Sequence, residues 1–339
     1  DYLVDGKTIA GTAKAGYSSA DEAWLSSVTG AVGNDEVKAL VAYAYRDGHE
    51  TKPNSKTKAF PTDWSSDAVL GRVVWVLSDQ HQFNLTGDFY RKSADTTDIS
   101  ASLFSNYKSD ATQQQDIDRT QFSLEHIYKS ETLALFDQLK SKIWYQESNN
   151  ETATSFMNNA NTKRDFSTTY KEKNTGIKFD ASKNLEQQTL KYGLAVDQKD
   201  YSSTKVDLRN GATLPTLYQD GYLLDSELKR YAAYFSDEIR LGLFGRDLTL
   251  TPSLRFERQE YRPDSSSYSD VQARDFSYVS PSFAASYQFT PENYSYFKYT
   301  RGTRIPSPTE IGGIYQTTVG NPSYIVIGNS NLDEETSDA

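Results

Sequence analysis

The side chains best suited to acid–base or metal chemistry are three histidines, His49, His81 and His126. Zinc sites in proteins use His, Cys and carboxylate ligands, and this chain has no Cys. No two of the histidines show the His-x-His or His-x-x-x-His spacing that places two imidazoles on one face of an element. His49 opens a long polar segment, where a solvated side chain is the simplest expectation. The spacing argues against a metal site built from histidine.

Catalysis would require a nucleophile or a general base next to one of these histidines. Asp79 and His81 flank a short turn, and the chain has no Gly-x-Ser-x-Gly nucleophile elbow. The lack of Cys also removes a thiolate nucleophile. We therefore expect a protein that is not an enzyme.

The charge of the chain argues against nucleic acid as a partner. Its 46 Asp and Glu outnumber 36 Lys and Arg, which gives a formal charge of −10. A nucleic-acid binder needs a basic patch or stripe, and no basic run occurs. The chain also contains 24 Tyr and 16 Phe. So many aromatic residues in a polar chain are expected in strands that have one apolar face and one polar face.

The elements that would position these side chains have a period of two. Segments 82–90, 176–181, 248–257 and 279–289 place apolar residues at every second position, which is typical of β-strands with one apolar face. Segment 133–142 is also compatible with a single helix. The chain has no run of 18 or more apolar residues, so no membrane-spanning helix is predicted.

Short and long connections alternate along the chain. Short turns are expected at 33–35, 78–80, 183–186, 245–247 and 291–293. Long polar segments are expected at 47–66, 92–118, 147–172, 199–229 and 262–275. Strands of about ten residues with short turns at one end and long loops at the other are typical of outer-membrane β-barrels.

A soluble β-sandwich also has alternating strands, but its loops do not sort into short and long. Aromatic residues near the expected strand ends favour the barrel, because Tyr and Trp rings concentrate at membrane interfaces. These aromatics are Tyr43, Tyr45, Trp75, Phe89, Tyr90, Trp144, Tyr145, Tyr231, Tyr294, Tyr296 and Tyr299. The sequence therefore predicts an all-β, antiparallel transmembrane barrel.

The alternating segments add up to about thirteen strands, and single-chain bacterial barrels have an even number. The expected strands are 7–17, 22–32, 37–46, 67–77, 81–91, 119–130, 133–146, 173–183, 188–198, 230–241, 248–261, 276–289 and 294–303. Residues 304–339 have the composition of a polar loop without a closing strand, and an open sheet edge in lipid leaves backbone groups unpaired. We therefore predict that residues 1–339 are part of a larger barrel domain that ends within an outer loop.

Two motifs near the end of the chain carry a family resemblance. Residues 299–311, Tyr-Thr-Arg-Gly-Thr-Arg-Ile-Pro-Ser-Pro-Thr-Glu-Ile, resemble the aromatic-Arg-Ala-Pro-Ser box of TonB-dependent haem receptors, which a Glu-Leu pair follows. We call this segment box 1. Residues 329–337, Asn-Ser-Asn-Leu-Asp-Glu-Glu-Thr-Ser, resemble the Asn-Pro-Asn-Leu box downstream in that family and are called box 2. Segments 17–21, 45–50 and 64–75 are similar to the first barrel strands of the family.

The resemblance implies a barrel of about 22 strands with a plugged lumen. The plug and the N-terminal segment that contacts the TonB complex are not included in this chain. The first barrel strand follows the plug in this family, so residues 304–339 correspond to the seventh outer loop, where both boxes are found. No resident cofactor is implied, because haem is the transported ligand.

The chain departs from the family pattern at three positions of the boxes and lacks the family's haem-binding histidine. Thr303 stands where the aromatic residue of the box is expected, Ile305 replaces its Ala, and Ser330 replaces the Pro of box 2. The family's haem-binding His is also absent between the boxes. Haem iron accepts a Tyr phenolate, and Tyr315 and Tyr324 lie in that segment, with Tyr315 the preferred candidate. A tyrosine on such a loop is more often a residue that packs or contacts a partner.

The resemblance makes Arg304, Pro306, Glu310 and Asn331 candidates for the loop that receives haem or its carrier. Each also has a structural interpretation. Pro306 ends a strand because it lacks a ladder donor, and Arg304 is expected to pair with Glu310.

These features together predict a TonB-dependent receptor in the outer membrane of a Gram-negative bacterium. Its cargo is predicted to be haem, delivered by haemoglobin or a haemophore. The expected partners are that carrier, the TonB complex and outer-membrane lipid. The alternatives are a ferric-siderophore receptor of the same family and a passive porin or adhesin.

Overall fold

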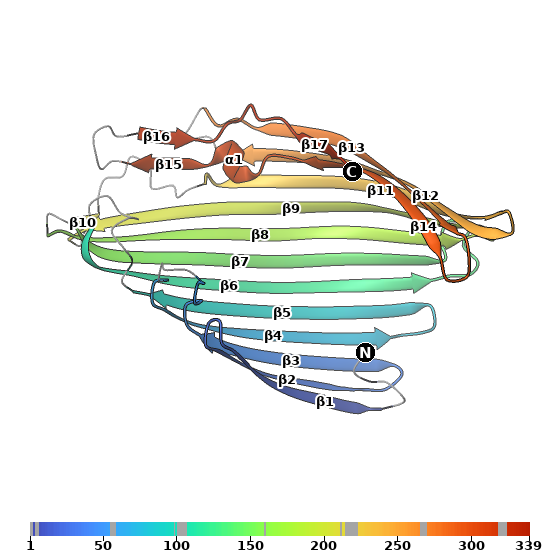
Figure 1. Ribbon diagram of the computed structural model, residues 1–339, viewed down its shortest axis with the longest axis horizontal. Coiled ribbons are helices and arrows are strands. Elements are labelled where there is room, and N and C mark those ends of the chain that lie inside the picture. The colour runs from blue at the N-terminus through green and yellow to red at the C-terminus, as the bar shows by residue number, and fades with distance from the viewer. Residues whose placement is uncertain are drawn as a thin grey trace.

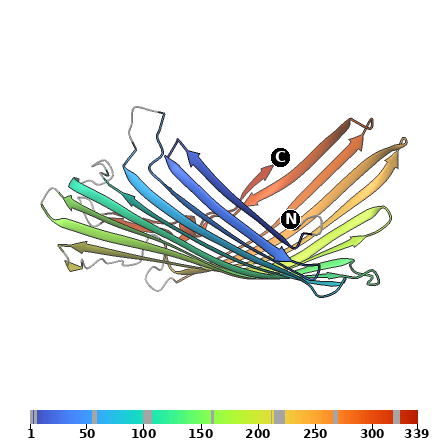
Figure 2. The ribbon, with the colours of Figure 1, turned by 90° about the horizontal axis from the view of Figure 1, so that it is seen from below.

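The computed structural model describes residues 3, 7–54, 59–97, 99, 107–158, 161–210, 212–213, 223–264, 270–317 and 324–339. They form one large antiparallel sheet that curves into an open trough (Figure 1, Figure 2). No helix in this part of the chain is long and apolar enough to cross a membrane.

The sheet consists of long strands that are neighbours in sequence. Its first half contains β1 (Ile9–Ser18), β2 (Ala23–Gly33), β3 (Val37–Gly48), β4 (Thr62–Val76), β5 (His81–Thr96), β6 (Tyr107–Lys129) and β7 (Gln138–Asn158). Its second half contains β8 (Lys163–Asn184), β9 (Gln188–Arg209), β10 (Ala212–Thr213), β11 (Ser226–Leu243), β12 (Arg246–Pro263), β13 (Arg274–Gln288) and β14 (Tyr294–Arg304). Then follow helix α1 (Pro308–Gly312), β15 (Ile314–Thr317), β16 (Tyr324–Ile327) and β17 (Glu335–Asp338).

Each long strand pairs with the next along the chain, in the order β1 to β9, β11 to β14 and β17. The two-residue strand β10 pairs with β9, and β15 and β16 form a separate hairpin. The thirteen predicted strands correspond one to one to β1–β9 and β11–β14. The predicted all-β, antiparallel barrel sheet is confirmed.

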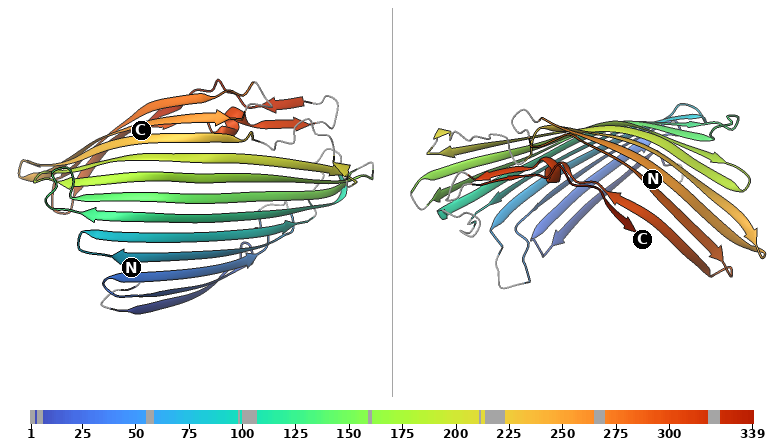
Figure 3. Two further views of the ribbon diagram at one scale, coloured as in Figure 1. Left: turned by 180° about the vertical axis from the view of Figure 1, so that it is seen from behind. Right: turned by 90° about the horizontal axis from the view of Figure 1, so that it is seen from above.

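The two faces of the sheet are inverted relative to a soluble protein. Leu194 of β9 and Phe256 of β12 are 59% and 44% exposed, whereas Asp197 and Glu257 on the opposite face are both 4% exposed. Helix α1 lies on the concave side of the trough (Figure 3) and packs against Tyr261, which shares the face of Glu257. The concave face is therefore polar and the convex face apolar, as expected of a sheet that lines a wet lumen and contacts lipid.

Aromatic rings gather at the short-turn end of the sheet. Trp75 lies 5.8 Å from Phe83, and the edge of Phe136 contacts Tyr128 at 6.1 Å between ring centroids. These residues come from β4, β5, β6 and the turn before β7. Such a cluster is consistent with the predicted interfacial girdle, because these rings have an apolar body and Tyr and Trp also have a polar tip.

The loops are shorter than predicted because the strands continue into them. Strands β6 to β9 contain 21 to 23 residues, and the connection predicted at 147–172 consists only of residues 159–162. Charged cross-strand pairs allow the sheet to extend beyond the apolar band. Lys173 lies opposite Glu147 on one side and Asp200 on the other.

One alternative is excluded and one expectation is wrong. Segment 133–142 is not a helix, because β7 begins at Gln138 and its period of two continues through Ile143 and Tyr145. Residues 304–339 were expected to form a polar loop, but they contain α1 and the β15–β16 hairpin, and residues 335–338 form β17, which pairs with β14. The acidic composition of this segment concealed a strand whose Glu335 and Asp338 lie opposite Arg304 and Arg301.

The short turns have local causes that the sequence contains. The side chain of Asn34 accepts hydrogen bonds from the backbone N–H groups of Glu36 and Val37, at 3.0 and 2.8 Å. Phe244 and Gly245 both have positive φ, 53° and 71°, which is the conformation of a type I′ hairpin turn. The strands therefore reverse tightly at this end of the sheet.

Replacing Leu194 with Arg tests whether the convex face contacts lipid. In a bilayer the charge should cost about 2–4 kcal/mol of unfolding free energy, measured by urea unfolding of the protein in vesicles. Leu135→Arg is the control, because Leu135 is 75% exposed in a turn and its replacement should change stability by less than about 0.5 kcal/mol. Equal, small effects of both substitutions would indicate that the convex face lies in water.

Candidate functional site

The predicted site residues gather at the end of the trough opposite the short turns. Arg304 ends β14, Glu310 lies in α1, and Pro306 is buried between them. The backbones of Tyr315 and Tyr324 pair within the β15–β16 hairpin, where they face Val326 and Thr317. The side chains of both tyrosines lie outside the described part of the structure. We call α1, β15, β16, β17 and the segments that join them (305–317 and 324–338) the box unit.

Box 1 turns into a helix because its residues form a capping box. The backbone N–H and the hydroxyl of Ser307 donate to the Glu310 carboxylate at 2.7 and 2.8 Å, and the Glu310 N–H donates to the Ser307 hydroxyl at 3.3 Å. Pro308 occupies the first turn, where its missing N–H costs nothing. A helix of one turn benefits from such caps, because it has only a few backbone hydrogen bonds of its own, such as that from the Ile311 N–H to the Ser307 carbonyl at 3.1 Å.

Arg304 connects this helix to the end of box 2. Its guanidinium donates to Glu310 at 2.6 Å and to Glu335 at 3.1 Å. The predicted pairing of Arg304 with Glu310 is therefore confirmed. Arg304, followed by the backbone and hydroxyl of Ser307, lowers the pKa of the Glu310 carboxyl from 4.5 to about 2.

The two boxes form one structural unit although they are separated in sequence. Strand β17 of box 2 pairs with β14, so that Glu335 lies opposite Arg304. The Asn329 N–H donates to the Glu310 carbonyl at 2.8 Å, and the Gly328 N–H donates to the Gly313 carbonyl at 2.7 Å. These backbone contacts hold the start of box 2 against the end of α1.

Asn331 is the candidate site residue in box 2. Its N–H donates to the Asn329 side chain at 2.9 Å, which fixes the local turn of the backbone. Asn331 itself is exposed, whereas Pro306 is buried. The Asn331 side chain is therefore accessible to a partner at the mouth of the trough.

Box 2 is attached to the sheet by an arginine that sequence reasoning missed. Arg274, the first residue of β13, donates to the carbonyls of Ser330 and Leu332, the latter at 3.0 Å, and lies 3.4 Å from the Asp333 carboxylate. Ser330 is buried, and its hydroxyl accepts the Gln272 N–H at 3.0 Å. The serine that replaces the family's proline is thus used as a hydrogen-bond partner. Nothing in the spacing of Arg274 from box 2 could have indicated this contact.

Apolar packing completes the attachment of the box unit. Ile311 of α1 packs with Tyr261 and Phe276, both on the concave face. Ile314 of β15 packs with Leu224 and Val271, which precede β11 and β13. The box unit therefore covers the ends of β11, β12 and β13 from the lumen side.

Below the box unit, the concave wall carries paired charges. Arg230 donates to Asp197 at 2.8 Å, and Glu257 accepts from Arg255 at 2.6 Å. Higher on the wall, Arg164 and Asp207 form a two-point pair at 3.0 and 2.5 Å. Because both signs are paired, the wall offers hydrogen-bonding groups to a polar ligand without a large net charge.

The histidines form no metal centre at this end of the trough. His49 lies in the β3–β4 connection and contacts Asp63 at 2.7 Å, as a solvated loop residue would. His126 lies on the convex face, as predicted from its alternation with Phe122 and Leu124. Within the described residues, no group of three or more His, Cys, Asp or Glu side chains is arranged to hold a metal ion.

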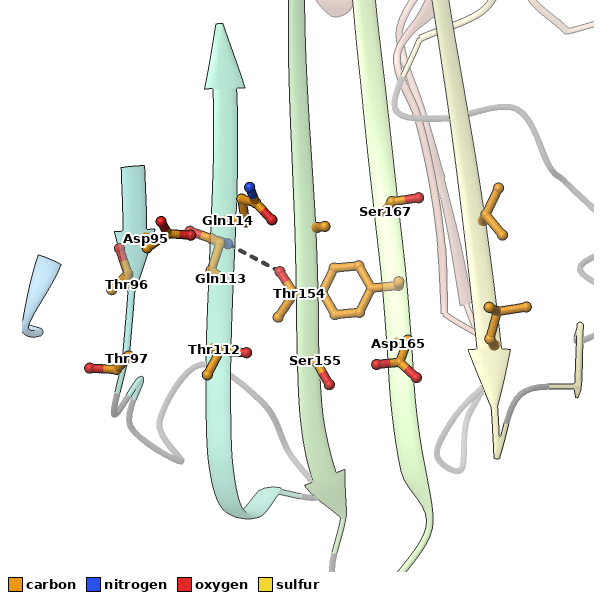
Figure 4. A pocket seen from close by; sticks show the side chains of 14 residues that line it. Asp95, Thr96, Thr97, Thr112, Gln113, Gln114, Thr154, Ser155, Asp165 and Ser167 are labelled. Atoms are coloured by element: carbon orange, nitrogen blue, oxygen red, sulfur yellow. Dashed lines mark hydrogen bonds between the residues drawn. The ribbon is translucent and has the colours of Figure 1, made fainter. Parts of the chain in front are cut away.

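A separate hollow of about 390 Å³ lies at the outer ends of β5 to β9 (Figure 4). Its lining is mainly Thr, Ser, Gln and Asp, and Gln113 donates to Thr154 across it at 3.2 Å. None of the box residues lines this hollow. It is therefore distinct from the site that the sequence predicted.

The comparison with known proteins identifies the family. The family model "TonB dependent receptor-like, beta-barrel" matches residues 17–339. The chain therefore belongs to the TonB-dependent receptor family, whose members are outer-membrane proteins of Gram-negative bacteria and act as transporters. No curated protein matches the chain in sequence.

Solved structures show the same fold at low sequence identity. The copper transporter OprC is 10% identical, with a TM-score of 0.69 over 97% of this chain and 49% of that one. A double mutant of the Serratia marcescens haemophore receptor HasR, in complex with its haemophore HasA and haem, is 15% identical, with a TM-score of 0.67 over 99% and 51%. The FrpB iron transporter from Neisseria meningitidis is 16% identical, with a TM-score of 0.63 over 90% and 49%. The chain spans about half the length of the structures that it matches.

The pKa of Glu310 predicts how acid affects the box unit. Its folded-state pKa of about 2 lies below the usual 4.5, so its stabilising contribution is complete above pH 4.5 and disappears as the pH falls toward 2. Hydrogen exchange of residues 305–317 should therefore accelerate between pH 4.5 and 2, beyond the intrinsic pH dependence of exchange. Glu310→Gln should remove this acid step, whereas Glu334→Gln, at an exposed position, should preserve it. An unchanged step in Glu310→Gln would contradict the assignment.

Gly328→Ala tests the contact between the two boxes. A Cβ at residue 328 would lie 2.6 Å from the Ile311 carbonyl carbon, so the boxes must separate to admit it. Such overpacking costs about 1–3 kcal/mol, and limited proteolysis should cut the box unit faster. Gly71→Ala is the matched control, because a Cβ there meets no atom within 4 Å. Equal cleavage rates for both variants would show that the boxes do not pack as described.

Proposed function

We propose that this chain is part of a TonB-dependent outer-membrane receptor that takes up haem, delivered by haemoglobin or a haemophore. The observation that carries the proposal is the box unit: both segments that resemble the haem-receptor motifs fold together at the mouth of the trough. Box residues that lie 31 positions apart, Arg304 and Glu335, meet in one ion pair. Motif resemblance that arose by chance would not predict this contact.

We propose different roles for the candidate residues. Arg304, Pro306 and Glu310 hold the shape of the box unit, because their polar groups or ring are used within it. Asn331 is exposed at the mouth and is proposed to contact the carrier. Tyr315 is proposed as the iron ligand, with Tyr324 as the second candidate, because a phenolate can replace the histidine that this segment lacks.

The remaining structure supports passage of a polar ligand. The concave wall below the box unit carries paired Arg, Asp and Glu side chains, and the convex face is apolar. We infer that cargo binds at the outer ends of the strands and passes along this wall. In the family, the TonB complex supplies the energy through an N-terminal region of the receptor. The outer membrane is the proposed location.

Spectroscopy of the complete receptor tests the haem proposal. Adding haem, either free or carried by haemoglobin or a haemophore, should shift the Soret band. Tyr315→Phe or Tyr324→Phe should remove the phenolate signature, because the substitution deletes only the ligating oxygen. Tyr294→Phe, at the short-turn end, should leave the spectrum unchanged.

No Soret change under any of these conditions would overturn haem as the cargo. The ferric citrate transporter FecA and the ferric yersiniabactin receptor FyuA share this fold with TM-scores of 0.55 and 0.56. Ferric siderophores would then be the next cargo class to titrate.

A further inference from the structure

Two histidines that are far apart in sequence meet on the convex face at the short-turn end. The register of β5 and β6 pairs His81 with Tyr128 and Phe83 with His126. Residues 81 and 126 are therefore diagonal neighbours on one face of the sheet. Their facing ring nitrogens, Nδ1 of His81 and Nε2 of His126, are 3.0 Å apart.

Neighbouring rings hold this pair in place. The His81 ring lies 4.8 Å from the Tyr128 ring, with 26° between their planes, and the His126 ring lies 4.5 Å from the Phe83 ring, with 13° between their planes. The two imidazole planes differ by only 6°, and their centroids are 5.2 Å apart. Both histidines are half-buried. The aromatic neighbours therefore keep the two imidazoles side by side, with their facing nitrogens together.

A separation of 3.0 Å requires a shared proton or a shared metal ion. One neutral imidazole can donate its N–H to the other, but two protonated rings would repel each other at this distance. Two metal–nitrogen bonds of about 2.0–2.1 Å at a right angle span about 2.9 Å, whereas a tetrahedral angle requires about 3.3 Å. The spacing therefore fits cis positions of a tetragonal ion better than a tetrahedral Zn²⁺ site. Cu²⁺ and Ni²⁺ prefer tetragonal geometry, and Cu²⁺ binds nitrogen ligands most tightly of the divalent ions.

We propose that His81 and His126 form a two-imidazole site for Cu²⁺, and more weakly for Ni²⁺, at the short-turn rim. The ion would replace the shared proton after each ring turns until its nitrogen lone pair points at the ion, and water would complete its coordination. Glu125 cannot contribute a carboxylate, because it lies on the opposite face and accepts from Asn84. Both protein ligands of the site are therefore uncharged imidazoles. Because no carboxylate holds the ion, it exchanges readily. It rests on the geometry of β5 and β6 alone and is independent of the transported cargo.

Titration of the complete receptor in detergent with Cu²⁺ tests the proposal. Electron paramagnetic resonance should show nitrogen hyperfine structure from two imidazoles. His81→Gln and His126→Gln should each reduce this to one imidazole at most and weaken binding by at least about 10–100-fold, the usual cost of disturbing a metal site. His49→Gln is the matched control, because His49 lies at the other end of the sheet, and it should behave as the wild type. Zn²⁺ should bind more weakly than Cu²⁺.

An unchanged spectrum and affinity in His81→Gln or His126→Gln would overturn the site. Chemical modification of the wild-type protein provides a second test if a variant fails to fold. Cu²⁺ should protect His81 and His126, but not His49, from diethyl pyrocarbonate. If Cu²⁺ leaves both residues as reactive as before, the pair shares a proton and binds no metal.

Discussion

Hydrogen bonding between neighbouring antiparallel strands is the constraint on which the rest of this structure depends. Within a membrane, every backbone N–H and C=O must find a partner in the protein, because lipid offers none. The order of strands along the sheet follows the order in sequence, so each strand is satisfied by its neighbours in the chain. Side chains then point alternately to lipid and to lumen, which explains why exposed Leu194 and buried Asp197 occur in the same strand.

The same ladder determines how the box unit is attached. Because β17 returns to pair with β14, Arg304 and Glu335 face each other, and Arg304 also reaches Glu310 of α1. Exposed ion pairs contribute little to stability individually. The apolar contacts of Ile311 and Ile314 with the sheet therefore supply most of the stabilisation, and the charged groups define the orientation of the unit. A receptor mouth built in this way presents its loop on a rigid support.

Several features could be predicted because they depend on neighbours in sequence. The period of two located thirteen strands, and a short turn such as that at Asn34 follows from hydrogen bonds between its side chain and the neighbouring backbone. The capping box in box 1 is also encoded locally, since Ser307 and Glu310 are three residues apart, although helix α1 was not predicted. Strand lengths were underestimated, because outward charges such as Lys173 conceal the apolar signal while the backbone continues to pair. Strand β17 at residues 335–338 was missed for the same reason, because its charged residues conceal the strand pattern.

By itself, the sequence determined the all-β class, the alternation of lipid and lumen faces, and the resemblance of the two boxes to a receptor family. These properties are encoded by spacing along the chain. Only the tertiary structure decided which distant residues meet. The contact of Arg274 with the Ser330 carbonyl depends on how the segment between β16 and β17 folds back onto the sheet. The pairing of His81 with His126 depends on strand register, because a shift of one residue would move one partner to the other face. Register is a property of paired strands and cannot be derived from either strand alone.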